Sequence, residues 1–274
     1  MVNAYAPTNL QGALDALSSE RLIPYAGGTD LMVKERHAAP FLFLNRIEEL
    51  RRLTEDAEHL RIGAALTYRE LLRHPLAPPI LKEAVSSIAA PAVRNTGTLG
   101  GNVANASPKG DGALVCFVAD SLVRLVGAGG AERVLPIAEF YEGRGRTVLR
   151  PDELLVEILM PKRWLAGYRY CKVGARKALA ISRVSFAGLY AAEDGVVAHV
   201  AMAFGAVEDV VVRRPELDRL LVGRTLDEAR ALKEEVLAAW DKALVPLKGR
   251  VPAEYRKRVC LNLARDFLEG SLGT

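Results

Sequence analysis

One stretch constrains the fold of this chain more than any other: residues 96–111, TGTLGGNVANASPKGD. It has neither helical nor strand periodicity, so the sequence predicts a loop, held between apolar segments on both sides. Its glycines let main-chain N–H groups approach a ligand closely, and its Thr, Asn and Ser side chains add polar groups. Such a loop suits an anionic or richly polar ligand. For the loop alone, an ordinary surface turn rich in Gly and Asn explains the pattern equally well.

Another glycine loop lies near the start of the chain, at residues 26–31, AGGTDL. The apolar run 21–26 before it predicts a strand, which Pro24 restricts to a sheet edge or a strand end. Residues 31–34 after it predict a turn of helix. A strand, a glycine loop and a helical turn together form a phosphate cradle. The spacing matches neither GxGxxG nor the Walker loop, which excludes a standard dinucleotide or P-loop fold.

Composition limits the function classes. The chain has 274 residues, half of them hydrophobic, and this is enough for a real core and favours two domains over one. A net charge of +4 with dispersed basic residues argues against nucleic-acid binding. The sequence shows no signal peptide and no apolar run of membrane-spanning length. Its scattered histidines and its cysteines (Cys116, Cys171, Cys260) argue against disulfides, a metal site or an iron–sulfur cluster in this chain, so we expect a cytoplasmic protein.

The first two thirds of the chain alternate between strand and helix signals. A capping-box pattern at Thr8 predicts a helix with an apolar face formed by Leu10, Ala13, Leu14 and Leu17. A second capping box, Thr67 to Glu70, predicts another short helix. Further helices are predicted over 78–93, 112–119 and 137–141, and strands over 41–44, 60–65, 121–126 and 153–160, with a hairpin turn at 127–130.

In the last third of the chain the predicted elements have a different order, with strands first and helices after them. Strands are predicted over 168–173, 181–192 and 196–206, with a hairpin turn at 193–195. A third capping box at Thr225 opens a helix carrying Leu232, Val236 and Trp240, and the final helix is expected to bury Tyr255, Val259, Leu263 and Phe267. This order is typical of helices packed on one face of an antiparallel sheet.

Three motifs in order resemble a known family. AGGTDL at 26–31, TLGGN at 98–102 with Ser107, Pro108 and Asp111 beyond it, and YCKVGARKALAIS at 170–182 are similar to the FAD-binding subunit of the molybdenum hydroxylases. That group includes xanthine, carbon monoxide and nicotinate dehydrogenases, and the resemblance covers the whole chain.

The resemblance implies an α+β fold. It consists of a two-subdomain FAD-binding domain of the PCMH/vanillyl-alcohol-oxidase-like type and a C-terminal domain of antiparallel sheet and helices. We expect the subdomains at 1–55 and 56–163 and the C-terminal domain at 164–274.

The resemblance also implies which residues contact the cofactor. Main-chain N–H groups from Ala26 to Val33 would wrap the pyrophosphate, residues 98–102 would contact the pyrophosphate and the flavin side, and Asp111 would bond to the adenosine part. The implied contacts are Ala26, Gly27, Gly28, Thr29, Asp30, Leu31, Thr98, Leu99, Gly100, Gly101, Asn102, Ser107, Asp111, Leu155 and Lys172.

The residues themselves allow simpler roles. Asp111 stands where an Asp commonly caps a helix, Thr98 could only close a turn, and Lys172 could be a solvated strand lysine. No cysteine set supports the extra iron–sulfur cluster of the hydroxybenzoyl-CoA reductase branch. Neither glycine loop holds a His or Cys for covalent flavin attachment, so we expect non-covalent FAD.

The resemblance implies an electron-transfer subunit of an oxidoreductase. FAD would receive electrons from 2Fe-2S clusters in a small partner, which takes them from the molybdenum cofactor of a large partner, and would pass them to NAD or another acceptor. The alternatives are a stand-alone flavin reductase similar to UDP-N-acetylenolpyruvoylglucosamine reductase, for which no convincing proton donor is visible, and a non-enzymatic nucleotide-binding subunit.

Overall fold

The computed structural model describes residues 4–33 and 39–273. Lys34, at the end of the predicted helical turn, lies outside them. The chain forms two compact units. The first comprises residues 1–77, 88–106 and 120–162, and the second comprises 78–87, 107–119 and 163–274. Because segments around residues 78–87 and 107–119 belong to the second unit, the chain passes between the units several times.

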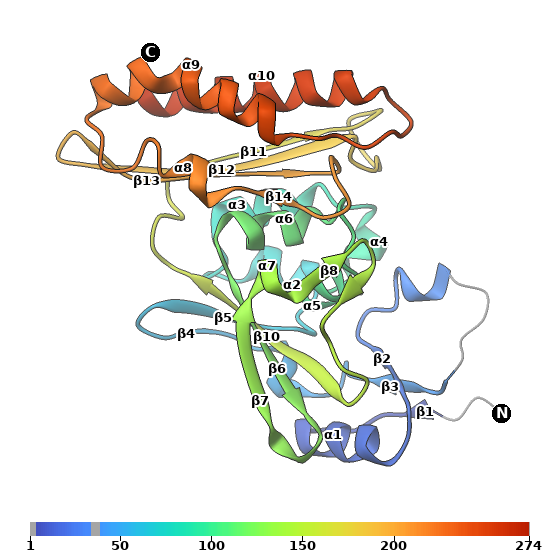
Figure 1. The fold of residues 1–274 in the computed structure, drawn as a ribbon. Coiled ribbons are helices and arrows are strands. Elements are labelled where there is room, and N and C mark those ends of the chain that lie inside the picture. Colours follow the sequence, from blue (N-terminus) through green and yellow to red (C-terminus); the bar gives the residue numbers. More distant parts are fainter. Residues whose placement is uncertain (1–3, 34–38, 274) are drawn as a thin grey trace. The chain divides into compact units, whose positions relative to one another are not determined.

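The first unit holds two larger sheets (Figure 1). The parallel sheet has the order β1-β3-β2 and is formed by Ala4–Tyr5, Phe41–Phe43 and Ile23–Tyr25. Pro24 lies in an edge strand, as the sequence predicts. The antiparallel sheet has the order β4-β5-β10-β6-β7 and is formed by Leu53–Glu55, His59–Gly63, Glu153–Pro161, Leu122–Gly127 and Glu132–Pro136.

Short elements complete the first unit. Its helices are α1 (Leu10–Ser19), α2 (Tyr68–Arg73), α4 (Pro91–Arg94), α5 (Leu99–Ala104) and α7 (Ile137–Phe140). Single 3₁₀ turns lie at Leu31–Val33, Glu48–Arg51 and Ala128–Gly130, and a small hairpin joins β8 (Tyr141–Gly143) to β9 (Arg146–Thr147). The core between α1 and the sheets contains Leu14, Leu42, Ile47, Leu50 and Leu154.

The second unit is a four-stranded antiparallel sheet in the order β11-β12-β13-β14, between two layers of helices (Figure 1). The strands are Tyr168–Val173, Val184–Glu193, Val196–Gly205 and Val212–Arg213. Helices α9 (Leu226–Ala243) and α10 (Ala253–Leu272) cover one face, and α3 (Pro79–Ser86) and α6 (Asp111–Val118) pack on the other; α8 (Pro215–Asp218) follows β14. Trp240, Phe186, Phe204 and Phe267 dominate the core on the α9/α10 side.

Several sequence-based boundaries are wrong, each for a local reason. The N-cap of α1 is Asn9, whose side chain accepts from Gly12 N, and not Thr8. The predicted helix 78–93 ends at Ser86, because Ala89 has φ +43° and the residue before Pro91 avoids helical backbone. Strand β12 begins at Val184 and not at 181, because its pairing with β11 starts at Val184, opposite Val173 at the end of β11.

The loop prediction for 96–111 is wrong at its centre, where α5 forms. The Thr98 side chain caps this helix by accepting from Gly101 N at 2.9 Å, and Leu99 and Val103 are fully buried. Because glycines disfavour helices, the hydrophobic periodicity of the sequence does not reveal α5. Gly100 is required by packing, since a Cβ there would lie 2.4 Å from Ala64 O.

The predicted apolar stripe of the final helix is confirmed only in part: Phe267 is buried, and Val259 and Leu263 pack against the core. Its buried residues are Arg256, Cys260, Ala264, Phe267, Leu268 and Leu272, whereas Tyr255 is exposed and Val259 and Leu263 are only half-buried. The stripe is rotated because the helix packs against both α9 and β12.

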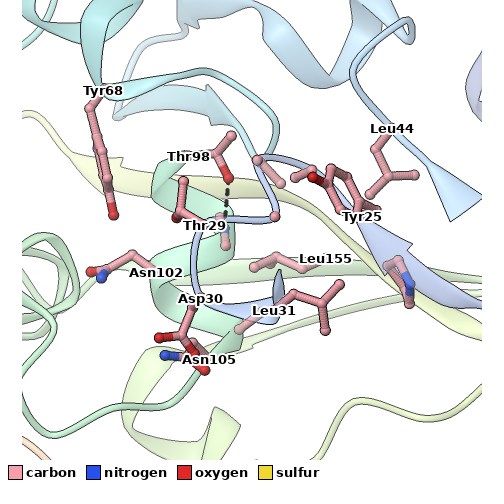
Figure 2. Close-up of a pocket in the computed structure, with 18 of the residues that line it drawn as sticks. Tyr25, Thr29, Asp30, Leu31, Leu44, Tyr68, Thr98, Asn102, Asn105 and Leu155 are labelled. Carbon is pink, nitrogen blue, oxygen red and sulfur yellow. Dashed lines mark hydrogen bonds between the residues drawn. The ribbon is translucent and has the colours of Figure 1, made fainter. Parts of the chain in front are cut away.

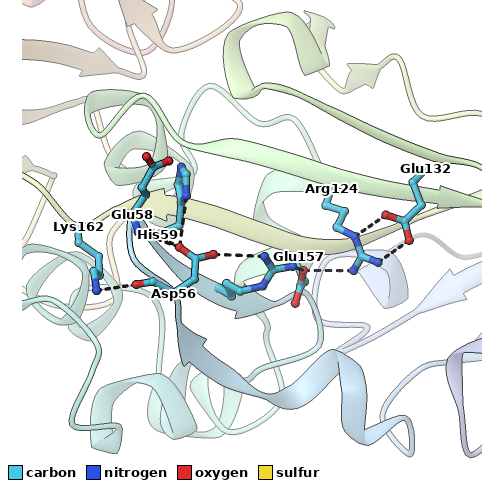
Figure 3. A network of polar contacts seen from close by, with 8 residues as sticks. Asp56, Glu58, His59, Arg124, Glu132, Glu157 and Lys162 are labelled. Carbon is cyan, nitrogen blue, oxygen red and sulfur yellow. Dashed lines mark hydrogen bonds and ion pairs between the residues drawn. The ribbon is translucent and has the colours of Figure 1, made fainter.

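A chain of ionic contacts crosses the antiparallel sheet of the first unit (Figure 3). Glu157 of β10 accepts from Arg61 at 2.6 Å and from Arg124 at 3.2 Å, and Arg124 also pairs with Glu132 at 2.6 Å. At the other end, Asp56 accepts from the backbone N–H groups of His59 and Glu58. These backbone bonds lower the pKa of Asp56 from its ordinary value of 3.8 to about 2.

Candidate functional site

The first unit contains a cavity of about 430 Å³, within the size range of ligand pockets (Figure 2). All of its lining residues belong to this unit. Most of them come from the end of β2 and the loop after it, from α5, and from β10. Most of the predicted cofactor contacts line it, namely Ala26, Gly27, Gly28, Thr29, Asp30, Leu31, Thr98, Gly100, Gly101, Asn102 and Leu155.

The two glycine loops, the first at residues 26–31 and the second at residues 96–111, pack directly against each other. A Cβ on Gly27 would lie 2.0 Å from the carbonyl oxygen of Thr96 and 2.9 Å from the Cα of Gly97. No side chain can therefore be added at Gly27 unless one of the two backbones moves. Segments far apart in the sequence are thus brought together at the cavity by backbone-to-backbone contact.

The first loop presents unused hydrogen-bond donors. Within the described residues, the main-chain N–H groups of Gly27 to Leu31 bond to no protein acceptor. The loop is closed by its own later residues, because Met32 N donates to Gly28 O at 2.8 Å. Successive free N–H groups in a tight loop form a concave site for an anion. This loop is therefore the part of the cavity best suited to phosphate oxygens.

In the second loop, the main-chain N–H groups are already engaged in hydrogen bonds within the protein. The N–H groups of Leu99 and Gly100 donate to Leu66 O and Ala64 O, at 3.3 and 3.1 Å. Those of Gly101 and Asn102 donate to the Thr98 hydroxyl and to Thr98 O. The main-chain donors of residues 99–102 are thus engaged. Asn102 and the exposed Gly101 both line the cavity, so a ligand would meet the surface of these two residues there.

Leu155 reaches the cavity from a β-bulge. The register of β10 against β6 shifts between Leu155 and Glu157, and Val156 O accepts from Ala64 N at 2.9 Å. A bulge changes the direction of neighbouring side chains. The buried Leu155 side chain supplies an apolar wall, and Leu154 beside it also lines the cavity.

Four predicted contacts do not line this cavity. Leu99 is fully buried in the packing of α5, and Ser107, Asp111 and Lys172 belong to the second unit. The Ser107 hydroxyl accepts from Lys109 N at 3.2 Å, within a local turn. The predicted site residues therefore fall into a group that lines the cavity and a second group, Ser107, Asp111 and Lys172, that lies in the second unit. Leu99 belongs to neither group.

The second group centres on a buried ion pair. Lys172 Nζ donates to Asp111 Oδ2 at 2.7 Å and to Ser87 O at 3.1 Å, and Ser182 Oγ donates to Asp111 Oδ1 at 2.9 Å. Asp111 is the first residue of α6 but does not cap it, since the N-cap is Gly110. Lys172 is not a solvated strand lysine either. The nearby Tyr170 hydroxyl lies 3.2 Å from Ser87 Oγ, and burial, followed by the charge of Asp111, raises the pKa of Tyr170.

Sequence reasoning missed three polar residues of the cavity lining: Tyr25, Tyr68 and Asn105. Tyr25 is next to the first glycine loop in sequence, and this position is the only signal that could have found it. Tyr68 is placed by its main chain, because Tyr68 N donates to Gly97 O at 2.9 Å. Asn105 is the C-cap of α5, a helix that the sequence did not reveal.

Other site classes find little support in the part of the chain that the structure describes. No cluster of three or more His, Cys, Asp or Glu residues there is placed to hold a metal ion. Burial raises the pKa of the Cys116 and Cys260 thiols to about 12, which keeps them protonated and inert. Among the same residues, no helix has both the length and the apolar character needed to cross a membrane.

The cavity fits part of a dinucleotide such as FAD. Its free N–H groups suit a pyrophosphate, its amide side chains suit sugar or ring polar atoms, and Leu155 with the neighbouring apolar residues suits a flat ring system. The close approach at Gly27 keeps side chains out of this region.

Comparison with known proteins agrees with this geometry. Residues 1–163 match the family described as the FAD binding domain in molybdopterin dehydrogenase, and residues 169–271 match the CO dehydrogenase flavoprotein C-terminal domain. The chain is 32% identical to the carbon monoxide dehydrogenase medium chain of Hydrogenophaga pseudoflava, covering 80% of this chain and 77% of that one. It is 29% identical to the nicotinate dehydrogenase FAD-subunit of Eubacterium barkeri, over 81% and 80% of the two chains.

A solved structure shows the same fold. The reconstituted CO dehydrogenase from Oligotropha carboxidovorans contains a chain that superposes with a TM-score of 0.89 at 27% identity, covering 100% of this chain and 98% of that one. The two family matches follow one another along the chain and together cover nearly the whole sequence. This chain is therefore a member of the family of FAD-binding subunits of molybdopterin dehydrogenases, with a C-terminal domain of the CO dehydrogenase flavoprotein type.

Proposed function

We propose that this chain is the electron-transfer subunit of a molybdenum hydroxylase and that its FAD passes electrons from iron–sulfur clusters of a partner to a terminal acceptor. The observation that carries the proposal is the first glycine loop: residues 27–31 line the cavity, and their main-chain N–H groups bond to no acceptor among the described residues of a chain that matches the FAD-binding family. Bound FAD supplies the redox chemistry, and the protein supplies binding and orientation.

In this proposal the first glycine loop binds the pyrophosphate of FAD through its main chain. The side chains of Thr98 and Asn102 add polar contacts, and Leu155 packs beside the cofactor. Leu99 acts indirectly by anchoring α5 in the core. Contacts of Ser107, Asp111 and Lys172 with the cofactor remain predictions from the family resemblance.

We infer that FAD is held non-covalently. The described lining of the cavity contains no His or Cys, the side chains to which flavins are attached covalently. We also propose a functional division at residues 1–55, 56–163 and 164–274, in which the first two parts hold FAD. The polypeptide runs between the structural units more often than this linear division suggests.

The proposed partners are a small subunit with 2Fe-2S clusters and a large subunit with the molybdenum cofactor. Support comes from relatives that are themselves subunits, including the medium chains of carbon monoxide dehydrogenase from Hydrogenophaga pseudoflava and of glyceraldehyde dehydrogenase from Sulfolobus acidocaldarius. NAD or another compound would accept the electrons. We propose that the complex works in the cytoplasm.

The test is purification of the native complex through an affinity tag on this chain, with molybdenum, iron and flavin measured per chain. We expect all three, and we expect the flavin absorbance at 450 nm to bleach when the iron–sulfur clusters are reduced by substoichiometric dithionite. A chain that purifies with flavin but without iron or molybdenum would contradict the proposal and favour a stand-alone reductase.

A further inference from the structure

We propose that Tyr25 is a positioning residue for FAD binding: its aromatic ring supports the first glycine loop and holds the N–H groups of residues 27–31 ready for the ligand. This inference rests on the proposed function of the cavity, and it assigns a role to a residue that contributes no charge and is not part of either glycine loop.

Tyr25 is held firmly by its own strand. It is the last residue of β2 and pairs in register with Phe43 of β3. Side chains alternate along a strand, so the rings of Tyr25, Phe41 and Phe43 share the face opposite the buried Leu42. The Tyr25 ring makes edge-to-face contacts with Phe41 and Phe43, with centroids 5.5 and 4.9 Å apart. These two rings fix the direction in which Tyr25 extends toward the cavity.

The ring packs directly on the backbone of Gly28. This residue has φ +68°, a conformation that favours glycine, and a Cβ built on it would lie 2.1 Å from both Cζ and the hydroxyl oxygen of Tyr25. Figure 2 shows the Tyr25 hydroxyl directed toward the glycine loop and away from its strand. The ring thus fills the space in which the loop would otherwise relax.

The consequence is a loop ordered before the ligand arrives. On its other side the loop meets Thr96 and Gly97, so it lies between the Tyr25 ring and the second glycine loop. Binding to a loop that is already ordered avoids the entropy cost of ordering it. Removing the ring is expected to make the loop more mobile and to weaken ligand binding, although the N–H donors themselves remain.

The ring is expected to matter more than the hydroxyl. Within the described chain the Tyr25 hydroxyl makes no hydrogen bond, whereas the ring contacts two aromatic neighbours and the loop. Phenylalanine keeps all of the ring contacts, so Tyr25→Phe should restore what Tyr25→Ala loses.

The experiment compares Tyr25→Ala, Tyr25→Phe and a matched control, Tyr255→Ala, whose tyrosine is exposed on α10. FAD is titrated into the flavin-free full chain and followed by flavin fluorescence. We expect Tyr25→Ala to raise the Kd at least tenfold, Tyr25→Phe to lie within about twofold of wild type, and Tyr255→Ala to have no effect. Equal affinity of Tyr25→Ala and wild type, or equal weakening by Ala and Phe, would overturn the proposal.

A second measurement needs no FAD and so separates this inference from the proposed function. Hydrogen–deuterium exchange of the flavin-free chain should be faster at residues 27–31 in Tyr25→Ala than in wild type or Tyr25→Phe. Each protein is measured at the same interval below its own melting temperature. Unchanged exchange there refutes the supporting role even if FAD binds. Wild-type protein that binds no FAD but shows the exchange difference refutes the proposed function alone.

A double-mutant test makes the contact itself measurable. Gly28→Ala should accelerate exchange at residues 27–31 strongly in wild type, because its methyl group collides with Tyr25. In the Tyr25→Ala background the methyl group has room, so the added acceleration should be smaller. Strictly additive effects would show that Tyr25 and Gly28 do not interact, against the proposal.

Discussion

Lys172 and Asp111 form an ion pair of 2.7 Å, with side chains only 13% and 5% exposed. Lys172 lies on β11 and Asp111 begins α6, and Ser182 and Ser87 complete the hydrogen bonds of the pair. Burying both charges is costly unless their partners are in place. The two most distinctive charged residues of the family motifs thus satisfy each other within the second unit.

Removing one member should therefore destabilise this unit. Asp111→Asn leaves the Lys172 ammonium buried without its counter-charge, and we expect a loss of about 3 kcal/mol in the free energy of unfolding. Urea denaturation of the flavin-free chain measures it. As a control, Asp266→Asn removes the partner of Arg169 in an exposed pair and should cost less than about 1 kcal/mol. Similar losses in the two variants would contradict the structural role of the buried pair.

The N-cap of α5 should contribute both to the stability of the fold and to FAD binding. Thr98→Ala removes the hydroxyl that accepts from Gly101 N, a change that typically costs about 1 kcal/mol. We expect it also to weaken FAD binding, because Thr98 lines the cavity. Thr225 caps α9 in the same way but is not part of the cavity lining. Thr225→Ala should therefore reduce the melting temperature alone; FAD loss in both variants would point to general destabilisation.

The lowered pKa of Asp56 predicts that the stability of the fold decreases at acidic pH. Its folded pKa of about 2 lies below the ordinary 3.8, mainly because the His59 and Glu58 N–H groups donate to the carboxylate. The ionised form therefore stabilises the fold above about pH 4, and this contribution disappears as the pH falls toward 2. The stability difference between wild type and Asp56→Asn, measured by urea denaturation, should shrink over that window. A difference that stays constant from pH 5 to 2.5 would refute the assignment.

The sequence predicted best where local chemistry decides the structure. The capping boxes at Thr67 and Thr225 form as expected, with both side chain–backbone bonds present. The turn after β12 follows from Asp194 and Gly195, which adopt positive φ values of 50° and 77°. The order of the last third, with strands first and helices after them, correctly indicated an antiparallel sheet with helices packed against it.

What the sequence concealed depends on long-range contacts. Helix α5 exists because Gly100 packs on Ala64 and Leu99 enters the core, and propensity alone disfavours it. The pairing of Asp111 with Lys172 joins positions 61 residues apart, and neither position alone reveals it. The difference between the two glycine loops was also hidden, since only the structure shows that the N–H donors of residues 99–102 are bonded to Leu66, Ala64 and Thr98.

The proposed function depends most on FAD binding by the first glycine loop. The most direct test is the FAD content of purified wild type, Gly27→Ala and Gly270→Ala, from absorbance at 450 nm and release on denaturation. The added methyl of Gly27→Ala would meet Thr96 O, whereas Gly270 in α10 has open space around it. We predict one FAD per chain in wild type and Gly270→Ala, and loss of FAD from a still folded Gly27→Ala. Wild-type chain without flavin, or Gly27→Ala that retains it fully, would contradict the account.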